Sequence, residues 1–265
     1  MQHLKTQMAR RLESLIRKAI FEFDLIDGGP LGIALSGGKD SLTLLHLLSA
    51  LRGKGLPNFK LVAFHVSGAF SCGPGIQSRF LQPLCDQLGV ELHVADAKQS
   101  RENLECYSCS RRRRTLLFNM AKEQGVKTLA FGHHRDDNIQ TLLMNLLHKA
   151  EFEPLTPKIF MRDYDCTIIR PLIYVQESEI TTFAEQNSFR RITCQCPVGQ
   201  NSKRKQTEQL IDAIEEIFPN ARSNLAQAGF AYGKKLRLNI DQKGMGSPLD
   251  SAQPLDSPLH LSNTL

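Results

Sequence analysis

The sequence is poor in aromatic residues: tryptophan is absent and tyrosine occurs only 4 times, so few rings are available for stacking on bases. It also lacks any apolar run of about 18 residues, which excludes a membrane-spanning helix and a membrane partner. The opening segment MQHLKTQMARRLESLIRKAI mixes charges with apolar residues, unlike a secretory signal. We therefore expect a globular protein that works in the cytoplasm.

The chain has 265 residues and a modest basic excess, with 33 Lys and Arg against 27 Asp and Glu, a net charge of +6. A chain of this length buries roughly 70 to 75% of its unfolded surface, so it needs no disulfide framework. In a protein without an export signal, cysteines are expected to be reduced thiols, metal ligands or catalysts. The 7 cysteines are the isolated Cys72, Cys85 and Cys166 and the close pairs Cys106/Cys109 and Cys194/Cys196.

Strand and helix patterns alternate along most of the chain. Strands are expected at 31–35, 61–66, 90–94, 128–131 and from 168, and helices at 4–23, 42–48, 113–124, 137–147, 177–186 and 206–218. Such alternation predicts an α/β fold, a Rossmann-like parallel sheet covered by helices on both faces.

The same patterns predict the domain organisation. We expect an N-terminal helix at 1–28, a nucleotide-binding domain at 29–218 and a helical segment at 219–242. Residues 243–265 are rich in Gly, Ser and Pro with scattered leucines, which predicts a flexible, disordered C-terminal tail.

The segment Ser36-Gly37-Gly38-Lys39-Asp40-Ser41 lies between a predicted buried strand and a predicted helix. Backbone N–H groups at such a turn, together with the helix dipole, favour a phosphate anion. Lys39 could contact the phosphates, the two serines could donate hydroxyls, and Asp40 could hold Mg²⁺ that bridges phosphate oxygens. The segment is neither a Walker A loop nor GxGxxG. In the alternative interpretation, the glycines serve only the geometry of the turn.

A second polar segment, from Gly132 and His133 to Asp137, follows the predicted strand 128–131. Ligands of open α/β sheets bind beyond the carboxyl ends of the strands, where this segment lies. Asp137 is predicted to be a helix N-cap whose carboxylate also binds a metal or orients a nucleotide. Gln140 is a weaker candidate for the same ligand site. The alternative is that the aspartates only cap the helix and the histidines are exposed.

The close cysteine pairs leave three kinds of site open. Cys106 and Cys109 could form a redox pair, although the polar segment before them differs from the strand that precedes a thioredoxin-type motif. All four paired cysteines could bind structural zinc, although a single residue separates Cys194 from Cys196. Three thiolates could instead hold an iron–sulfur cluster with one iron left open.

Basic residues flank both cysteine pairs. Neutralising phosphates releases condensed counterions, so two basic clusters beside one site favour a folded RNA as partner. Four successive arginines on a helix point around most of its circumference, so not all of them can contact one ligand. The alternative for either cluster is a solvated basic surface. The candidate RNA-binding residues are Arg111, Arg112, Arg113, Arg114, Lys203, Arg204 and Lys205.

Taken together in their order and spacing, these motifs resemble one known family over about residues 15–218. Ser36 to Ser41 resembles the PP-loop of the ATP pyrophosphatases, which cleave ATP between its α and β phosphates. The combination resembles the tRNA 2-thiocytidine synthetase family of that superfamily. The motifs that carry this resemblance are CYSCSRRRR from Cys106, FGHHRDDNIQT from Phe131, RPL from Arg170, and Cys194 followed by residues 200–205.

The resemblance implies an ATP-dependent tRNA sulfurtransferase that makes 2-thiocytidine at position 32. It implies ATP contacts by residues 36–41, Gly132 and His133, catalytic roles for Lys39, Asp40 and Asp137, and Mg²⁺ as a cofactor. It also implies a [4Fe-4S] cluster on Cys106, Cys109 and Cys194, with Cys196 as a substitute ligand. The implied partners are tRNA and a cysteine desulfurase as the sulfur source, and the N-terminal helix is compatible with a homodimer.

Two departures from the family pattern keep other functions open. Ser67 stands where the family has an aspartate after the second strand, and Cys194-Gln195-Cys196 replaces a second Cys-x-x-Cys. One alternative is an RNA-binding PP-loop protein with structural zinc and lost turnover. Another is an amidating ligase of the same superfamily, for which the sequence has no glutaminase segment.

Overall fold

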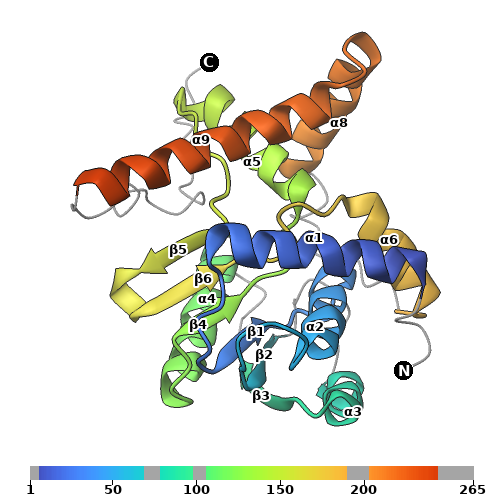
Figure 1. The fold of residues 1–265 in the computed structure, drawn as a ribbon, viewed down its shortest axis with the longest axis vertical. Coiled ribbons are helices and arrows are strands. Elements are labelled where there is room, and N and C mark those ends of the chain that lie inside the picture. Colours follow the sequence, from blue (N-terminus) through green and yellow to red (C-terminus); the bar gives the residue numbers. More distant parts are fainter. Residues whose placement is uncertain (1–5, 69–77, 98–105, 190–202, 244–265) are drawn as a thin grey trace, which may run out of the picture.

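The structure, a computed structural model, describes residues 6–68, 78–97, 106–189 and 203–243. A 6-stranded sheet with the order β3-β2-β1-β4-β6-β5 forms its centre (Figure 1). The strands are β1 (Leu31–Ala34), β2 (Leu61–Ser67), β3 (Glu91–Asp96), β4 (Thr128–Ala130), β5 (Lys158–Met161) and β6 (Cys166–Ile169).

The sheet is parallel except at one edge. In β1, Leu31 is in parallel register with Leu61 of β2 and with Thr128 of β4. The predicted parallel α/β sheet is therefore confirmed. The edge strand β5 was not predicted; it pairs antiparallel with β6, with Ile159 opposite Ile168.

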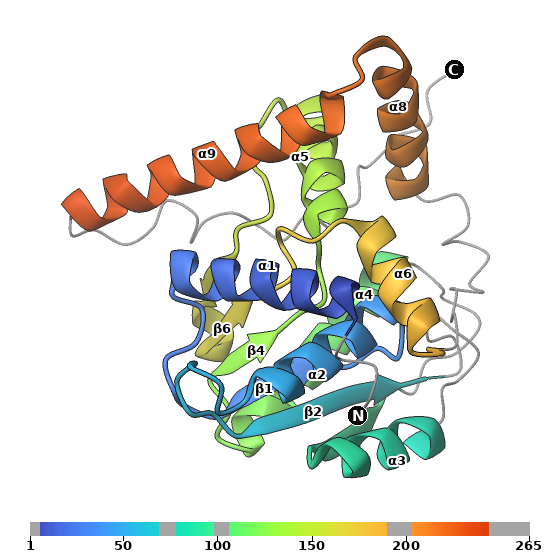
Figure 2. The ribbon, with the colours of Figure 1, turned by 45° about the vertical axis from the view of Figure 1, so that its right-hand side comes forward.

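Helices cover both faces of the sheet, as predicted (Figure 2). One core cluster joins the sheet to α1, α2, α3 and α6, and a second joins the opposite face to α4. The helices are α1 (Gln7–Phe23), α2 (Lys39–Leu51), α3 (Ser78–Leu88), α4 (Cys106–Glu123), α5 (Arg135–Lys149), α6 (Glu177–Gln186), α8 (Lys203–Ile217) and α9 (Ala221–Lys243), with a 3-10 turn at Arg162–Tyr164.

Side-chain alternation in β2 explains the two clusters. Ala63 packs in the cluster with α1 and α2, while Val62 and Phe64 pack in the cluster with α4. Successive side chains of a strand point to opposite faces, so a strand buried on both sides is continuously apolar. This is the pattern that the Leu61–Val66 segment shows in the sequence.

The N-terminal helix is confirmed as α1. Thr6 caps it by accepting a hydrogen bond from the backbone N–H of Ala9, at 3.1 Å. Its apolar face, including Leu12 and Ile16, is fully buried against α2 and α6. Helix α4 differs from the prediction because it begins at Cys106 instead of residue 113.

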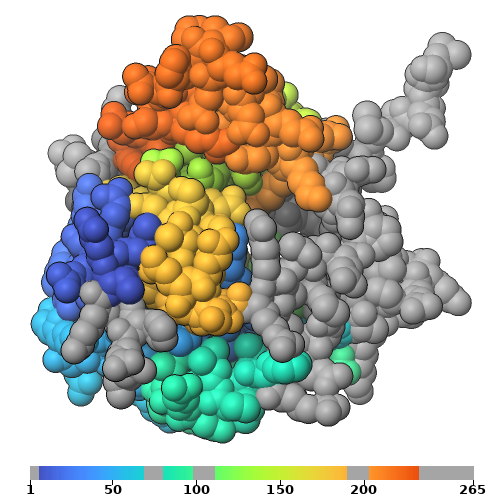
Figure 3. Space-filling view, turned by 90° about the vertical axis from the view of Figure 1, so that its right-hand side faces the viewer, coloured from blue at the N-terminus to red at the C-terminus, as the bar shows by residue number. Residues whose placement is uncertain are grey.

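The last two helices pack on α5 rather than on the sheet. Ile139 and Leu143 of α5 contact Ile211 of α8 and Ala226 of α9 in a small third cluster. In Figure 3 these C-terminal helices form the top of the molecule above α6. Residues 244–265, predicted to be a disordered tail, lie outside the described residues.

The chain order of the strands places a crevice at one point of the sheet. From β1 the chain continues outward through β2 and β3, and β4 then pairs on the other side of β1. In open α/β sheets such a switch point lies beneath the ligand site. No helix in the described part of the chain is long and apolar enough to cross a membrane.

Candidate nucleotide site

The glycine turn joins β1 to α2 through a network of serine hydroxyls. The Gly37 backbone has a φ of +84°, a conformation that favours glycine, and its N–H donates to Ser41 Oγ at 3.1 Å. Ser36 Oγ lies 3.0 Å from Ser41 Oγ and accepts the N–H of Gly38 at 3.2 Å. The turn is therefore held in shape by its own side chains, with α2 beginning directly after it.

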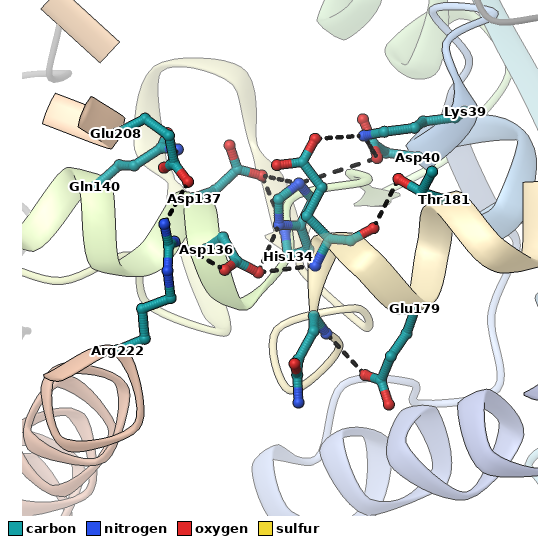
Figure 4. A network of polar contacts seen from close by, with 12 residues as sticks. Lys39, Asp40, His134, Asp136, Asp137, Gln140, Glu179, Thr181, Glu208 and Arg222 are labelled. Atoms are coloured by element: carbon teal, nitrogen blue, oxygen red, sulfur yellow. Dashed lines mark hydrogen bonds and ion pairs between the residues drawn. The ribbon is translucent and has the colours of Figure 1, made fainter. Parts of the chain in front are cut away.

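Lys39 is held by two carboxylates at the start of α2. Its Nζ lies 2.7 Å from Asp40 Oδ1 and 2.9 Å from Glu177 Oε1 at the start of α6 (Figure 4). Burial alone would lower the pKa of Lys39, but these ion pairs outweigh it and raise the pKa above the usual value. Lys39 is thus a charged ammonium beside the turn.

The segment after β4 lies directly against the turn. A Cβ at Gly132 would lie 3.1 Å from the backbone of Asp40 and Ser41, so only glycine allows this approach without displacement. Helix α5 begins at Arg135, with His134 as its N-cap. The prediction that Asp137 is the N-cap is wrong: Asp137 is one turn inside, where its carboxylate accepts the His134 N–H at 3.0 Å.

His134 lies among three carboxylates (Figure 4). Its Nε2 is 3.4 Å from Asp137 Oδ2 and 3.9 Å from Asp40 Oδ1, and its Nδ1 is 3.7 Å from Asp136 Oδ2. Burial favours the neutral imidazole, but these carboxylates outweigh burial and raise its pKa. Burial would likewise raise the pKa of Asp137, yet the neighbouring cations hold it well below the usual range.

A cavity of about 330 Å³ opens between the turn and α4. Ser36, Asp40 and Ser41 of the turn and of α2 line it. Arg113, His133, Asp137 and Arg204 also line it. Arg113 and Arg204, each more than 60 residues from the turn in sequence, thus contribute guanidinium groups to the lining of the cavity. Such groups suit an anionic ligand.

The two guanidinium groups reach this cavity from different helices. Arg113 of α4 donates from Nη2 to the Val66 carbonyl at 2.7 Å, at the end of β2. Arg204 of α8 donates from Nη1 to Asp137 Oδ1 at 2.7 Å. Each guanidinium carries five N–H donors, so both retain donors for a ligand.

His133 lines the cavity, and the buried Arg170 lies close to it. Burial and the charge of Arg170 lower the pKa of His133 to about 3, so its imidazole is neutral at pH 7. Burial and the charge of Arg114 lower the pKa of Arg170 to about 10, which still leaves it charged. His133 Nδ1 and Arg170 Nε are both buried and have no hydrogen-bond partner among the described residues.

The structure separates the seven basic candidates for RNA binding. Arg111 and Arg112 are exposed on α4, whereas Arg113 and Arg114 are half-buried, in agreement with the helical argument. Lys203 and Lys205 are exposed beside Arg204 at the start of α8. Arg113 and Arg204 therefore line the cavity, and the exposed cations next to them in the sequence flank it.

The cysteine cluster can be placed only in part. Cys106 and Cys109 lie in the first turn of α4, but their side chains are outside the described residues. Cys194 and Cys196 lie in residues 190–202, which are also outside. Positions 106, 109, 113 and 117 share one face of a helix, and Arg113 and Leu117 line the cavity.

Ser67 and Gln140 do not line the cavity. The Ser67 hydroxyl donates to the Ala95 carbonyl of β3 at 3.2 Å, so it joins two strands. Gln140, predicted as a weaker candidate for the ligand site, instead donates to Glu208 of α8.

Two residues of this network were not predicted from the sequence. Glu177 pairs with Lys39, and its backbone N–H donates to Asp136 at 2.8 Å. Its position at the start of a predicted helix was the available signal. Arg222 of α9 pairs with Asp136 at 3.3 Å and with three acids of α8, of which Figure 4 labels Glu208. Nothing in its local sequence indicates this role.

The fold and this site define a nucleotide-binding α/β protein, and comparison with known proteins supports that class. The model of the PP-loop domain family matches residues 4–196. A tRNA-cytidine(32) 2-sulfurtransferase of Geobacter metallireducens is 33% identical over 86% of this chain and 92% of its own. One from Syntrophotalea carbinolica is 34% identical over 85% of this chain and 90% of its own. The chain therefore belongs to the tRNA-cytidine(32) 2-sulfurtransferase family of PP-loop proteins.

A solved structure confirms the fold. The U34-tRNA thiolase of Methanococcus maripaludis, determined with its [4Fe-4S] cluster, has a TM-score of 0.68 over 86% of this chain and 79% of its own. The two sequences are 22% identical, so this likeness concerns the fold alone. The predicted PP-loop fold is thus confirmed by both the family model and a structural neighbour.

Proposed function

We propose that this protein is an ATP-dependent enzyme that converts cytidine 32 of tRNA into 2-thiocytidine. Family membership supports the reaction class, because the relatives are named for sulfur transfer to this nucleotide. The observation that carries the proposal is a cavity lined both by residues of the glycine turn and by Arg113 and Arg204. The cavity thus combines an anion site with two guanidinium groups, as adenylation of an RNA base requires.

The phosphates of ATP are proposed to bind at the turn. The N–H groups at the start of α2 and the helix dipole favour the phosphate charge. Lys39 would exchange its contact with Glu177 for a phosphate oxygen and stabilise the charge that develops as pyrophosphate leaves. The C2 oxygen of cytidine attacks the α-phosphorus, forming a C–O–P linkage while the bond to pyrophosphate breaks.

Magnesium fits this site only together with ATP. Among the described residues, no group of three His, Cys, Asp or Glu side chains could hold a metal ion. Mg²⁺ commonly uses one or two carboxylates and completes its shell with phosphate oxygens and water. Asp40 and Asp137, which both lie near His134 Nε2, would supply those carboxylates.

The second half-reaction replaces the C2 oxygen. A sulfide sulfur adds to C2 of the adenylated base, and AMP leaves with the former C2 oxygen, so no net oxidation occurs. The positions of Cys106 and Cys109, two turns and one turn before Arg113 on α4, fit thiolate ligands near the cavity. A [4Fe-4S] cluster held by Cys106, Cys109 and Cys194 would supply an open iron site for sulfide. Sulfur from a cysteine desulfurase arrives as a persulfide and would reach the sulfide level by two-electron reduction with a thiol reductant, which becomes a disulfide.

The exposed cations on α4 and α8 are proposed to bind the tRNA backbone. Arg111, Arg112, Lys203 and Lys205 flank the cavity and are free to meet phosphates outside it. We further propose the division into residues 1–28, 29–218, 219–242 and 243–265, and the homodimer through the N-terminal helix, as predicted from the sequence.

The proposal is tested with anaerobically purified protein, ATP, sulfide and a tRNA transcript, with nucleosides quantified by mass spectrometry. We expect 2-thiocytidine with the wild-type protein. Lys39→Ala should lower pyrophosphate release by about 100-fold while iron content stays unchanged, and Cys106→Ala should lose iron. Lys60→Ala, which removes an exposed lysine paired with Glu91, is the matched control. Colourless wild-type protein with stoichiometric zinc and no product would support the RNA-binding alternative instead.

A further inference from the structure

Arg222 forms a junction between three helices. Its guanidinium pairs with Asp136 of α5 at 3.3 Å, and with Glu208, Asp212 and Glu215 of α8 at 2.7, 2.6 and 2.6 Å. The Arg222 side chain is only 15% exposed. Four carboxylates around one cation are far more than charge balance requires, so the group fixes the relative positions of α5, α8 and α9.

The acids of α8 form one stripe along that helix. Glu208, Asp212 and Glu215 are separated by four and three residues, which places them on one helical face. The planar fork of arginine can engage several carboxylates in fixed directions, unlike the point charge of lysine. Arg222 therefore sets both the rotation of α8 and its position along its axis, because a shift of one residue would turn the stripe away.

Asp136 connects this junction to the nucleotide site. Its carboxylate is 8% exposed, and its second oxygen accepts the N–H of Glu177 at 2.8 Å. The next residue, Asp137, lines the cavity and receives Arg204 from the start of α8. Helix α8 is thus held at one end by Arg204 at the cavity and along its length by Arg222 (Figure 4 shows the contact with Asp136).

We propose that Arg222 is a positioning residue that holds α8 so that Arg204 presents its guanidinium to a phosphate group bound in the cavity. This inference rests on the proposed function for the presence of that phosphate. Asp137 takes one N–H of Arg204, and the half-exposed side chain, which also lines the cavity, keeps further N–H donors. The phosphate belongs either to ATP or to the RNA chain next to the target base.

The two sources are separated by measuring two dissociation constants without turnover. One ligand is a non-hydrolysable ATP analogue with Mg²⁺, and the other is an anticodon stem-loop RNA. Arg204→Gln should weaken the ligand whose phosphate it contacts by roughly tenfold and leave the other within about twofold. Arg222→Gln should weaken the same ligand by a similar factor.

A double-mutant cycle distinguishes positioning from general loss of structure. If Arg222 acts through Arg204, the Arg204→Gln/Arg222→Gln protein should bind no more weakly than Arg204→Gln alone. Arg222→Lys, which keeps the charge but loses the fork, should show a smaller loss for the same ligand. Two independent losses that multiply would overturn the proposal, as would an Arg222→Gln protein that folds and binds both ligands normally.

The matched control is an arginine with a purely structural contact. Arg52, after α2, donates to the carbonyls of Leu88 and Gly89 away from the cavity. Arg52→Gln should lower the melting temperature without changing either dissociation constant. If Arg222→Gln fails to fold, Arg222→Lys carries the test, and unchanged binding by that variant, when Arg204→Gln weakens one ligand, contradicts the proposal. Intact binding without 2-thiocytidine formation would refute the proposed function and leave this inference standing.

Discussion

Glu177 Oε1 lies 2.9 Å from Lys39 Nζ, joining the first residue of α6 to the first residue of α2. The two residues are far apart in sequence, and the contact occupies the one lysine of the glycine turn. Two of the three N–H donors of Lys39 thus meet carboxylates, whose negative charge competes with a phosphate for the ammonium. Glu177 is 45% exposed, so the ion pair is screened and its contribution is small.

The first prediction concerns this competition. Glu177→Gln removes a negative charge that competes with ATP for Lys39, so we expect two- to fivefold tighter binding, or about 0.5 to 1 kcal/mol. Isothermal titration with a non-hydrolysable ATP analogue measures the effect. Glu91→Gln, which alters an exposed pair with Lys60, serves as the control. Weaker binding by Glu177→Gln would mean that the contact orients Lys39 instead of competing for it.

The second prediction concerns the close approach of Gly132 to the turn. Gly132→Ala places a Cβ 3.1 Å from the backbone of Asp40 and Ser41, so the turn must shift by a few tenths of an ångström. We expect pyrophosphate release to fall about tenfold in kcat/KM, because misplacement of reacting groups is costly. Gly29→Ala is the matched control, since its nearest neighbour is 3.8 Å away. Equal activity of the two variants would exclude a role for this contact.

Ser67 provides a third prediction. Its hydroxyl donates a hydrogen bond to the Ala95 carbonyl, and the residue does not line the cavity. Serine in place of the family aspartate therefore does not change the residues that line the cavity. Ser67→Ala should cost about 1 kcal/mol of unfolding free energy and leave the KM for ATP unchanged. Urea denaturation and steady-state kinetics measure these two quantities. A large rise in KM would show that the hydroxyl contacts the nucleotide.

A fourth prediction uses the buried His46 of α2. Burial lowers its pKa to about 4, its Nε2 has no partner among the described residues, and its ring packs on Phe189. Between pH 6.5 and 4 the unfolded chain binds this proton and the native protein does not, so stability is lost as the pH falls through this window. His46→Leu should remove on the order of a few kcal/mol from the loss of unfolding free energy over this pH window. Parallel pH profiles of unfolding for the two proteins would contradict the burial argument.

Much of the fold was predictable because hydrophobic periodicity reports burial directly. The helix expected at 177–186 has the same bounds as α6, and the first four expected strands overlap β1 to β4. The antiparallel strand β5 was missed because four edge residues carry too little pattern. Pro83 inside α3 argues against a helix when the sequence is considered alone. Helix α4 begins early, at Cys106, in a polar stretch that has no apolar period.

The site was predictable where local motifs meet at strand ends. Asp40 and Asp137 both follow parallel strands next to the switch point, and the structure brings them within 3.9 Å of the same imidazole nitrogen. The separate role of Arg113 was not predictable, because four adjacent arginines look alike until helix packing turns one toward Val66. Arg222 depends entirely on tertiary structure, since its partners come from two other helices.

The central claim is that this chain installs sulfur on cytidine 32 of tRNA. It is tested most directly by mass spectrometry of tRNA nucleosides from cells that lack the protein, with site-specific analysis of position 32. We expect 2-thiocytidine to disappear, to return with the wild-type gene, and to remain absent with Lys39→Ala. Unchanged 2-thiocytidine in the deletion strain, or loss of a different thiolated nucleoside, would contradict the account.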